Sequence, residues 1–402
     1  MKASSIFLIV FLYLYIYNPV FAWPGFGFVA IISVIAILYC ITRPHTTLNY
    51  VKYYKAEFIL SVIITLYIFF ITTLNNQNKD LTMQMCSWAL FSFVTPVFII
   101  EAILSKAKSM SFLNLIMYTG VVAAIISFLC MVFPMFNEFI RSIQSDVESK
   151  GFDLEAFRYY GLANNLTSAY GYVQGTLAAI CILVWNTKKR YYLFFVLLTI
   201  SAAINARTGL FPVIIAFIYK FVCTIKNFKP KKVIQFVLII ICTFVLIKIF
   251  INAFPNNAEF ISDFFEQLEN IFITREEESA YERMFFLPKG TDVLLFGEGR
   301  DIIINYKGDS TDIGYVRQIF IGGLIFAVSL IIYEYILYRK MRKRSDGSLF
   351  PALLFISALI FNYKGFAFYT PGAFNRFIFL YYFFLIYNIR RQASTMEMKY
   401  KK

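Results

Sequence analysis

Charged residues are scarce in this sequence. Only 15% of the 402 residues are Asp, Glu, Lys or Arg, and 59% are hydrophobic, whereas soluble domains carry roughly 25% charged residues. A soluble fold does not have enough interior to bury so much apolar side chain. The composition therefore excludes a soluble globular domain and predicts an integral membrane protein.

Histidine is almost absent, and the cysteines have no paired spacing. The one histidine, His45, follows Arg43-Pro44 in a basic segment, and we interpret it as a solvated loop residue. The six cysteines stand singly in apolar stretches without CxxC spacing, which favours small membrane-embedded side chains over disulfides or metal ligands. The sequence has no P-loop and no Asp-x-Asp motif for a metal-bound nucleotide sugar. We therefore expect neither a metal nor a cofactor.

Long apolar runs dominate what is present. A spanning helix needs about 20 mostly apolar residues, so the runs predict an all-α, polytopic membrane protein of about twelve transmembrane helices in one membrane domain, 1–402. The expected spans are 5–22, 25–42, 57–74, 83–104, 112–134, 169–186, 191–206, 209–225, 233–251, 313–337, 349–363 and 375–389. Residues 1–22 also resemble a cleaved signal peptide, and both interpretations stay open.

The distribution of charge predicts an orientation. Most of the 38 basic residues lie in short runs on one side of the expected spans, and most of the 24 acidic residues lie on the other. This is the positive-inside pattern rather than a nucleic-acid surface. It predicts that both termini are cytoplasmic.

Two extracytoplasmic loops, 135–168 and 252–312, are long, and loops of that size are usually functional or disordered. In the second, Asn256 and Glu259 have capping-box spacing, and the apolar residues from Phe260 to Phe272 form one stripe. We expect a short amphipathic helix there and a second one beginning at Thr274. Such helices lie flat on the outer leaflet or over a cavity.

Arginines on the outer side run against the positive-inside trend. The most telling is Arg207, in the tight turn Asn205-Ala206-Arg207-Thr208-Gly209 at the membrane boundary. A guanidinium beside lipid is costly unless an anion or a cavity receives it, and it grips phosphate in a bidentate way. A lipid-linked pyrophosphate would suit several such residues; for any one of them, contact with a headgroup or carboxylate is the alternative. The set is Arg158, Arg207, Arg275, Arg283, Arg300, Arg317 and Arg376.

A second cluster joins Phe296-Gly297-Glu298-Gly299-Arg300-Asp301 to Thr311-Asp312-Ile313-Gly314-Tyr315-Val316-Arg317 and Gly322-Gly323. Asp312 stands at the mouth of an expected span, where a partly desolvated carboxylate can take a proton from a sugar hydroxyl. Asp312 is also suited to capping the following helix, and the two roles are compatible. Glu298 is the second candidate for the base.

In this order, the segments around Arg158, Arg207 and Asp312 resemble the bacterial O-antigen and capsular polysaccharide polymerases (Wzy-like). The resemblance covers most of the chain in layout and residues 157–326 in motifs. It implies an all-helical, metal-independent glycosyltransferase of the bacterial inner membrane. Such an enzyme transfers a growing glycan from undecaprenyl pyrophosphate to the next lipid-linked repeat unit, outside the cytoplasm. It also implies a chain-length regulator protein as a partner.

Under this hypothesis Arg158 and Arg207 bind pyrophosphate, followed by Arg283 and Arg300. Asp312 or Glu298 acts as the base, and Tyr159, Tyr160 and Tyr315 stack on sugar rings unless they are only interfacial anchors. Related O-antigen ligases carry a histidine eleven positions before a glycine; here Asp312 and Gly323 have that spacing, which favours a polymerase over a ligase.

The main alternative is a flippase for lipid-linked oligosaccharides. A common flippase has two similar halves, short loops and charges deep in the bundle. This sequence has no internal repeat, and we place Lys220, Lys248, Glu101 and Glu334 near span ends.

Overall fold

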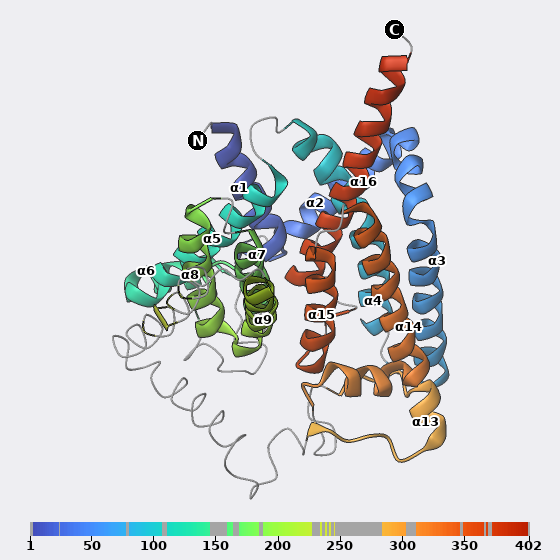
Figure 1. Cartoon of the computed structure of the whole chain (residues 1–402). Helices are drawn as coiled ribbons and strands as arrows, with labels where there is room; N and C mark the ends of the chain where they lie inside the picture. Colours follow the sequence, from blue (N-terminus) through green and yellow to red (C-terminus); the bar gives the residue numbers. More distant parts are fainter. Residues whose placement is uncertain are drawn as a thin grey trace, which may run out of the picture.

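The computed structural model describes residues 3–23, 25–77, 80–106, 111–144, 159–163, 169–184, 188–226, 284–302, 311–345, 349–365, 367–368 and 372–400, with single positions between 234 and 245. Helices make up almost all of this part of the chain (Figure 1). Its only β pairing consists of two isolated bridges, Val20 with Gly27 and Phe21 with Gln144. The all-α prediction is confirmed for the described residues.

Five helices are long and apolar enough to cross a membrane. They are α3 (Pro44–Leu74), α4 (Asp80–Phe98) extended by the π-helical turn η1 (Ile99–Ile103), α5 (Phe112–Val132), α9 (Phe211–Lys226) with the turn before it, and α14 (Gly314–Arg344). Shorter apolar helices are α1 (Ala3–Tyr17), α2 (Phe28–Thr42), α7 (Ala169–Val184), α8 (Arg190–Asn205) and α15 (Phe350–Tyr363), and α16 (Ala373–Tyr400) ends the chain. The helices suit a multi-pass membrane protein.

Most of these helices overlap the spans expected from sequence. The expected span at 233–251 lies almost wholly outside the described residues, and the count of twelve stays a prediction. The amphipathic helices expected after Asn256 and Thr274 also lie outside them.

Two expectations of local structure were wrong. The first helix ends at Tyr17, because Asn18 adopts φ 47° and its Oδ1 accepts the backbone N–H of Val29, closing a turn onto α2. Helix α3 begins at Pro44, so His45 lies exposed in a helical turn rather than in a loop. The first residues of the expected outer loop 135–168 lie in α6 (Pro134–Ile143), a short amphipathic helix, and the loop itself stays a prediction.

Helix α14 is broken at its glycine pair. Gly322 (φ −144°, ψ 21°) and Gly323 (φ 68°, ψ −172°) leave the helical region, and the positive φ of Gly323 is one that side chains rarely permit. The break separates 314–321 from 324–344. In Figure 1 the first part runs across the lower end of the bundle, where α13 (Thr291–Phe296) lies, and the second part rises along α3.

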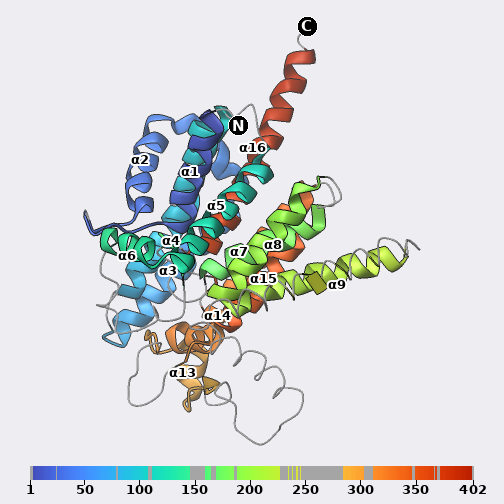
Figure 2. The same cartoon turned by 90° about the vertical axis from the view of Figure 1, so that its left-hand side faces the viewer.

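Both marked chain ends lie at one end of the bundle, and α13 lies at the other (Figures 1 and 2). We call these the terminus end and the α13 end. The basic run Arg339–Arg344 closes α14 beside the start of α3 at the terminus end.

Two carboxylates lie inside the bundle. Glu57 of α3 is fully buried and accepts hydrogen bonds from Lys340 Nζ (2.5 Å) and the Tyr382 hydroxyl (2.9 Å). Glu334 of α14 is only 4% exposed and stands midway between the Gly322-Gly323 break and Arg344. The expectation that Glu334 lies near a span end was therefore wrong, because α14 continues to Arg344, beyond the expected end at residue 337.

Candidate functional site

The turn between α8 and α9 carries Arg207. Helix α8 ends at Asn205, and the short 3-10 helix η6 (Arg207–Leu210) leads into α9. Glycines bring this turn directly onto α7: a Cβ on Gly175 would lie 1.6 Å from the Gly209 carbonyl oxygen, and one on Gly171 would lie 2.5 Å from Ala206 Cβ. The backbone at Arg207 is therefore fixed against a neighbouring helix.

The Asn205 side chain connects this turn to the segment that follows Arg158. Its Oδ1 accepts the backbone N–H of Tyr159 at 3.0 Å, and its Nδ2 donates to Ser127 Oγ at 3.1 Å and to the Ser201 carbonyl at 3.0 Å. The Ser127 hydroxyl in turn donates to the Tyr159 carbonyl at 2.5 Å. Both Asn205 and Ser127 are buried. This closed network holds residue 159 beside the start of the Arg207 turn.

The segment Phe296–Asp301 docks on the break in α14. The backbone N–H groups of Glu298 and Gly299 donate to the carbonyls of Phe320 and Ile321 at 2.7 and 2.9 Å. These carbonyls have no partner within their own helix because the helix stops there. The Tyr67 hydroxyl of α3 lies within hydrogen-bond distance of the carbonyls of Phe296 (3.0 Å) and Gly322 (2.9 Å). The glycines of both segments are what allow so close an approach.

An ion pair locks the end of the same segment. Arg317 donates from Nε to Asp301 Oδ1 at 2.8 Å and from Nη2 to Oδ2 at 2.6 Å. The Arg317 side chain is only 7% exposed. Arg317 therefore contacts a carboxylate, the alternative stated above for each outer arginine, and it is not free to bind phosphate.

The C-terminal end of α15 connects α7, on which the Arg207 turn packs, with the broken helix α14. On one side, the ring of Tyr172 in α7 stacks on Phe361 with centroids 3.7 Å apart. On the other, the amides of Asn362 and Gln318 exchange hydrogen bonds of 2.8 and 3.1 Å. A continuous path of packed side chains thus runs from the Arg207 turn through α7 and α15 to the broken helix.

The two predicted bases, Asp312 and Glu298, lie next to the broken helix α14. Asp312 is exposed, just before α14 begins. It does not cap the helix: no side chain accepts a hydrogen bond at the α14 N-cap, Ile313, and the nearby hydroxyl of Thr311 instead accepts the Ile313 N–H at 3.0 Å. Glu298 lies 3.5 Å from Arg300, and both side chains are about one-third exposed, at 34% and 28%. These groups are accessible from the α13 end.

The three predicted sugar-stacking tyrosines differ in their surroundings. Tyr159 packs on a small cluster of Met131, Ile200 and Ile204. The ring of Tyr160 meets Tyr170 edge-on, with centroids 6.0 Å apart. The Tyr315 hydroxyl donates to the Leu359 carbonyl at 2.9 Å. All three are half-buried, and their role in sugar binding stays a prediction.

The remaining predicted arginines are not all described. Arg158, Arg275 and Arg283 lie outside the described residues, as does the side chain of Arg207. Arg376 is described, and it is buried: its Nε and Nη2 donate to the Ile16 carbonyl at 3.0 and 2.7 Å. It satisfies a carbonyl at the C-terminal end of α1, which has no helical partner.

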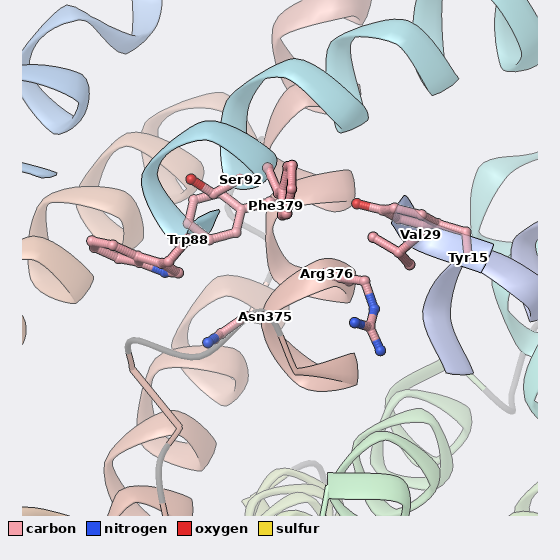
Figure 3. A pocket seen from close by; sticks show the side chains of 8 residues that line it. Tyr15, Val29, Trp88, Ser92, Asn375, Arg376 and Phe379 are labelled. Atoms are coloured by element: carbon pink, nitrogen blue, oxygen red, sulfur yellow. The ribbon is translucent and has the colours of Figure 1, made fainter. Parts of the chain in front are cut away.

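A cavity lies next to Arg376, between α1, α2, α4 and α16 (Figure 3). In this view Asn375 and Arg376 extend from α16 in different directions, with Trp88 and Tyr15 on opposite sides. Its volume is about 20 Å³, which is enough for roughly one water molecule. The cavity is too small for a sugar or a pyrophosphate.

Sequence reasoning missed several residues that build the site. Asn205 was named only as the first residue of the Arg207 turn, Ser127 was not singled out, and Asp301 had no assigned partner. The sequence did carry a signal for Asp301, because Asp301 and Arg317, sixteen residues apart, belong to the same cluster of motifs. Tyr67, Gln318 and Asn362 carried no signal, because their partners lie far away in the sequence.

Among the described residues, no three His, Cys, Asp or Glu side chains gather as a metal site. Comparison with protein-family models, with curated proteins and with solved structures finds no match to this chain.

Proposed function

We propose that this protein is a polysaccharide repeat-unit polymerase of the bacterial inner membrane. It transfers a glycan from undecaprenyl pyrophosphate to a lipid-linked acceptor unit. The observation that carries the proposal is the Asn205 network. It ties the segment that follows Arg158 to the turn that holds Arg207, and these are the two arginines that the sequence singles out for pyrophosphate.

The chemistry assigns a role to each part. As the bond between sugar and pyrophosphate breaks, negative charge collects on the leaving phosphate, and a fixed cation aimed at it is worth about 2.7–4 kcal/mol by analogy with single oxyanion donors. Arg158 and Arg207 supply that charge, and Arg283 and Arg300 are the next candidates. The base, Asp312 or Glu298, takes the proton from the attacking hydroxyl of the acceptor sugar.

The arrangement of the ends supports an orientation. The basic run Arg339–Arg344 lies at the terminus end, whereas Glu298, Asp301 and Asp312 lie at or beside the α13 end. With the basic end in the cytoplasm, the site faces the extracytoplasmic side, where a chain-length regulator protein would meet it.

The test is a gel of surface polysaccharide from a strain that lacks the gene, complemented with the wild type, Arg207→Ala or Asp312→Ala. We expect the deletion to leave lipid core bearing a single repeat unit, because export and ligation continue. We expect Arg207→Ala to shorten or remove the ladder. Arg207→Lys keeps the charge without the bidentate hydrogen bonds and should restore the ladder only in part.

Complementing the deletion strain separately with Glu298→Ala and with Asp312→Ala identifies the base. One of the two should abolish the ladder while the protein accumulates normally in the membrane. If the deletion strain carries no repeat unit on its core at all, polymerisation is not the missing step and the proposal fails.

One observation favours a second candidate, a flippase for lipid-linked oligosaccharides. Glu334 lies buried within the bundle, and a carboxylate inside a membrane helix bundle often marks a transport path. For a flippase, Glu334→Gln would block export of the repeat unit. For a polymerase, the same variant would leave single units on the core.

A further inference from the structure

Arg344, at the terminus end of α14, lies between two tyrosine rings. Its guanidinium carbon is 5.5 Å from the ring centroid of Tyr53 in α3 and 5.3 Å from that of Tyr382 in α16. A cation over an aromatic face is held electrostatically and loses rotamer freedom. Three helices therefore fix the position of one positive charge.

The neighbouring carboxylates are already used by other groups. Glu57 binds Lys340 and the hydroxyl of Tyr382. Glu101 binds Arg390 Nη1 at 2.6 Å and the Tyr50 hydroxyl at 2.8 Å. Each of these two carboxylates pairs with a cation other than Arg344.

Arg390 provides an internal comparison. It too lies over a tyrosine, 4.6 Å from the Tyr50 ring centroid, and its charge is balanced by Glu101. Arg344 has the same aromatic support but, among the described residues, forms no ion pair, and its Nη1 has no hydrogen-bond acceptor. Arg344 thus lacks an anion equivalent to Glu101, which pairs with Arg390.

The surroundings indicate where an anion would come from. Of the basic run Arg339–Arg344, only Lys340 forms an ion pair within the described part of the chain. Between the glycine break and this run, α14 carries exposed apolar side chains, among them Val328 (50%) and Ile332 (48%). On α14 the charged run therefore follows an exposed apolar stretch, as is typical of the level of lipid headgroups.

We propose that Arg344 and the α3, α14 and α16 side chains around it bind the phosphate of an anionic phospholipid headgroup. Basic pockets between transmembrane helices are suited to such headgroups, and each basic residue near the membrane surface contributes about 1 kcal/mol. This corresponds to about a fivefold change in affinity. The site does not depend on the proposed polymerase activity.

The test uses the full chain in phosphatidylcholine nanodiscs with rising fractions of phosphatidylglycerol, and measures bound lipid by native mass spectrometry and the midpoint of thermal unfolding. We expect phosphatidylglycerol to raise the midpoint of the wild type. Arg344→Gln should bind it about fivefold more weakly. Arg344→Lys should restore part of the binding, since it returns the charge without the planar group.

Arg342→Gln is the matched control, because it removes the same charge from the same helix end. Arg342 Nη1 only reaches the Tyr338 hydroxyl, at 3.3 Å on the exposed side. Inorganic phosphate added to pure phosphatidylcholine discs distinguishes a free-phosphate site, and stabilisation by phosphate alone would overturn the lipid assignment. Equal weakening by both glutamine variants, or none by Arg344→Gln, would show unspecific surface charge and contradict the proposal.

Discussion

The backbone N–H of Tyr159 and the Oδ1 of Asn205 lie 3.0 Å apart, although 46 residues separate them in sequence. This hydrogen bond connects two segments far apart in the sequence through a side chain that is fully buried. Under the proposed function, it holds the backbone that follows Arg158 beside the turn of Arg207. A loop residue is positioned precisely enough to bind a ligand only when rigid elements hold its backbone.

Replacing Asn205 with Ala should destabilise the protein by about 1–3 kcal/mol, because the Tyr159 N–H and the Ser127 hydroxyl lose a buried partner. It should also shorten the polysaccharide chains more than its effect on protein level explains. Thermal unfolding of the purified protein and a ladder gel measure the two effects. Asn137→Ala, on the surface helix α6, is the control and should change neither.

The buried pair of Asp301 and Arg317 should be far stronger than the exposed pair of Glu298 and Arg300. Asp301→Ala leaves a buried guanidinium without its carboxylate, at a cost of about 3–5 kcal/mol. Glu298→Ala removes a 3.5 Å contact between partly exposed groups, which is worth about 0–1 kcal/mol. Chemical unfolding of both variants checks the difference, and equal losses would contradict the assigned geometry.

Gly323→Ala should open the break in α14. The added Cβ would lie 2.1 Å from the Leu295 carbonyl oxygen, at a residue with φ 68°. Gly25→Ala has a comparable φ of 81° but no heavy atom within 4 Å, so it isolates backbone strain, about 1 kcal/mol or more. We expect the Gly323 variant to unfold at clearly lower temperature and to expose the segment from Phe296 to proteolysis. A midpoint equal to that of Gly25→Ala would show that the contact with Leu295 is unimportant.

Gly175→Ala should displace the Arg207 turn, since its Cβ would meet a backbone carbonyl that cannot move alone. Gly120→Ala is a useful comparison, because its nearest neighbour is the flexible Cδ1 of Leu177 at 2.5 Å. Activity in the ladder assay should fall strongly for the first variant and little for the second. The reverse order would argue against a role for the turn.

The all-helical fold and most helix positions could be predicted from apolar runs alone. Sequence patterns missed features that depend on polar side chains acting over a distance. Asn18 closes a turn inside an apparently continuous run, and Lys340 allows Glu57 to be buried where a span end was expected. Hydropathy scores each residue separately, so it does not detect pairs of this kind.

The motifs of the site were visible in sequence, but their contacts were not. Phe296–Asp301 and Gly322-Gly323 stood out as glycine-rich segments, and the structure brings them together. Their partners Tyr67 and Asn362 come from α3 and α15. An isolated tyrosine or asparagine in a helix of a chain this rich in both types gives no hint of such a partner.

The contact of Tyr67 with Phe296 also has a consequence for biosynthesis. The two residues are 229 positions apart, so α3 leaves the ribosome long before the segment that it receives. The segment can dock on the break in α14 only when it and both glycines have been made, so the Tyr67 hydroxyl has neither of these carbonyls near it until then. We expect the N-terminal helices to wait in the membrane as an incomplete bundle, and the last third of the chain to complete it in a late step of assembly.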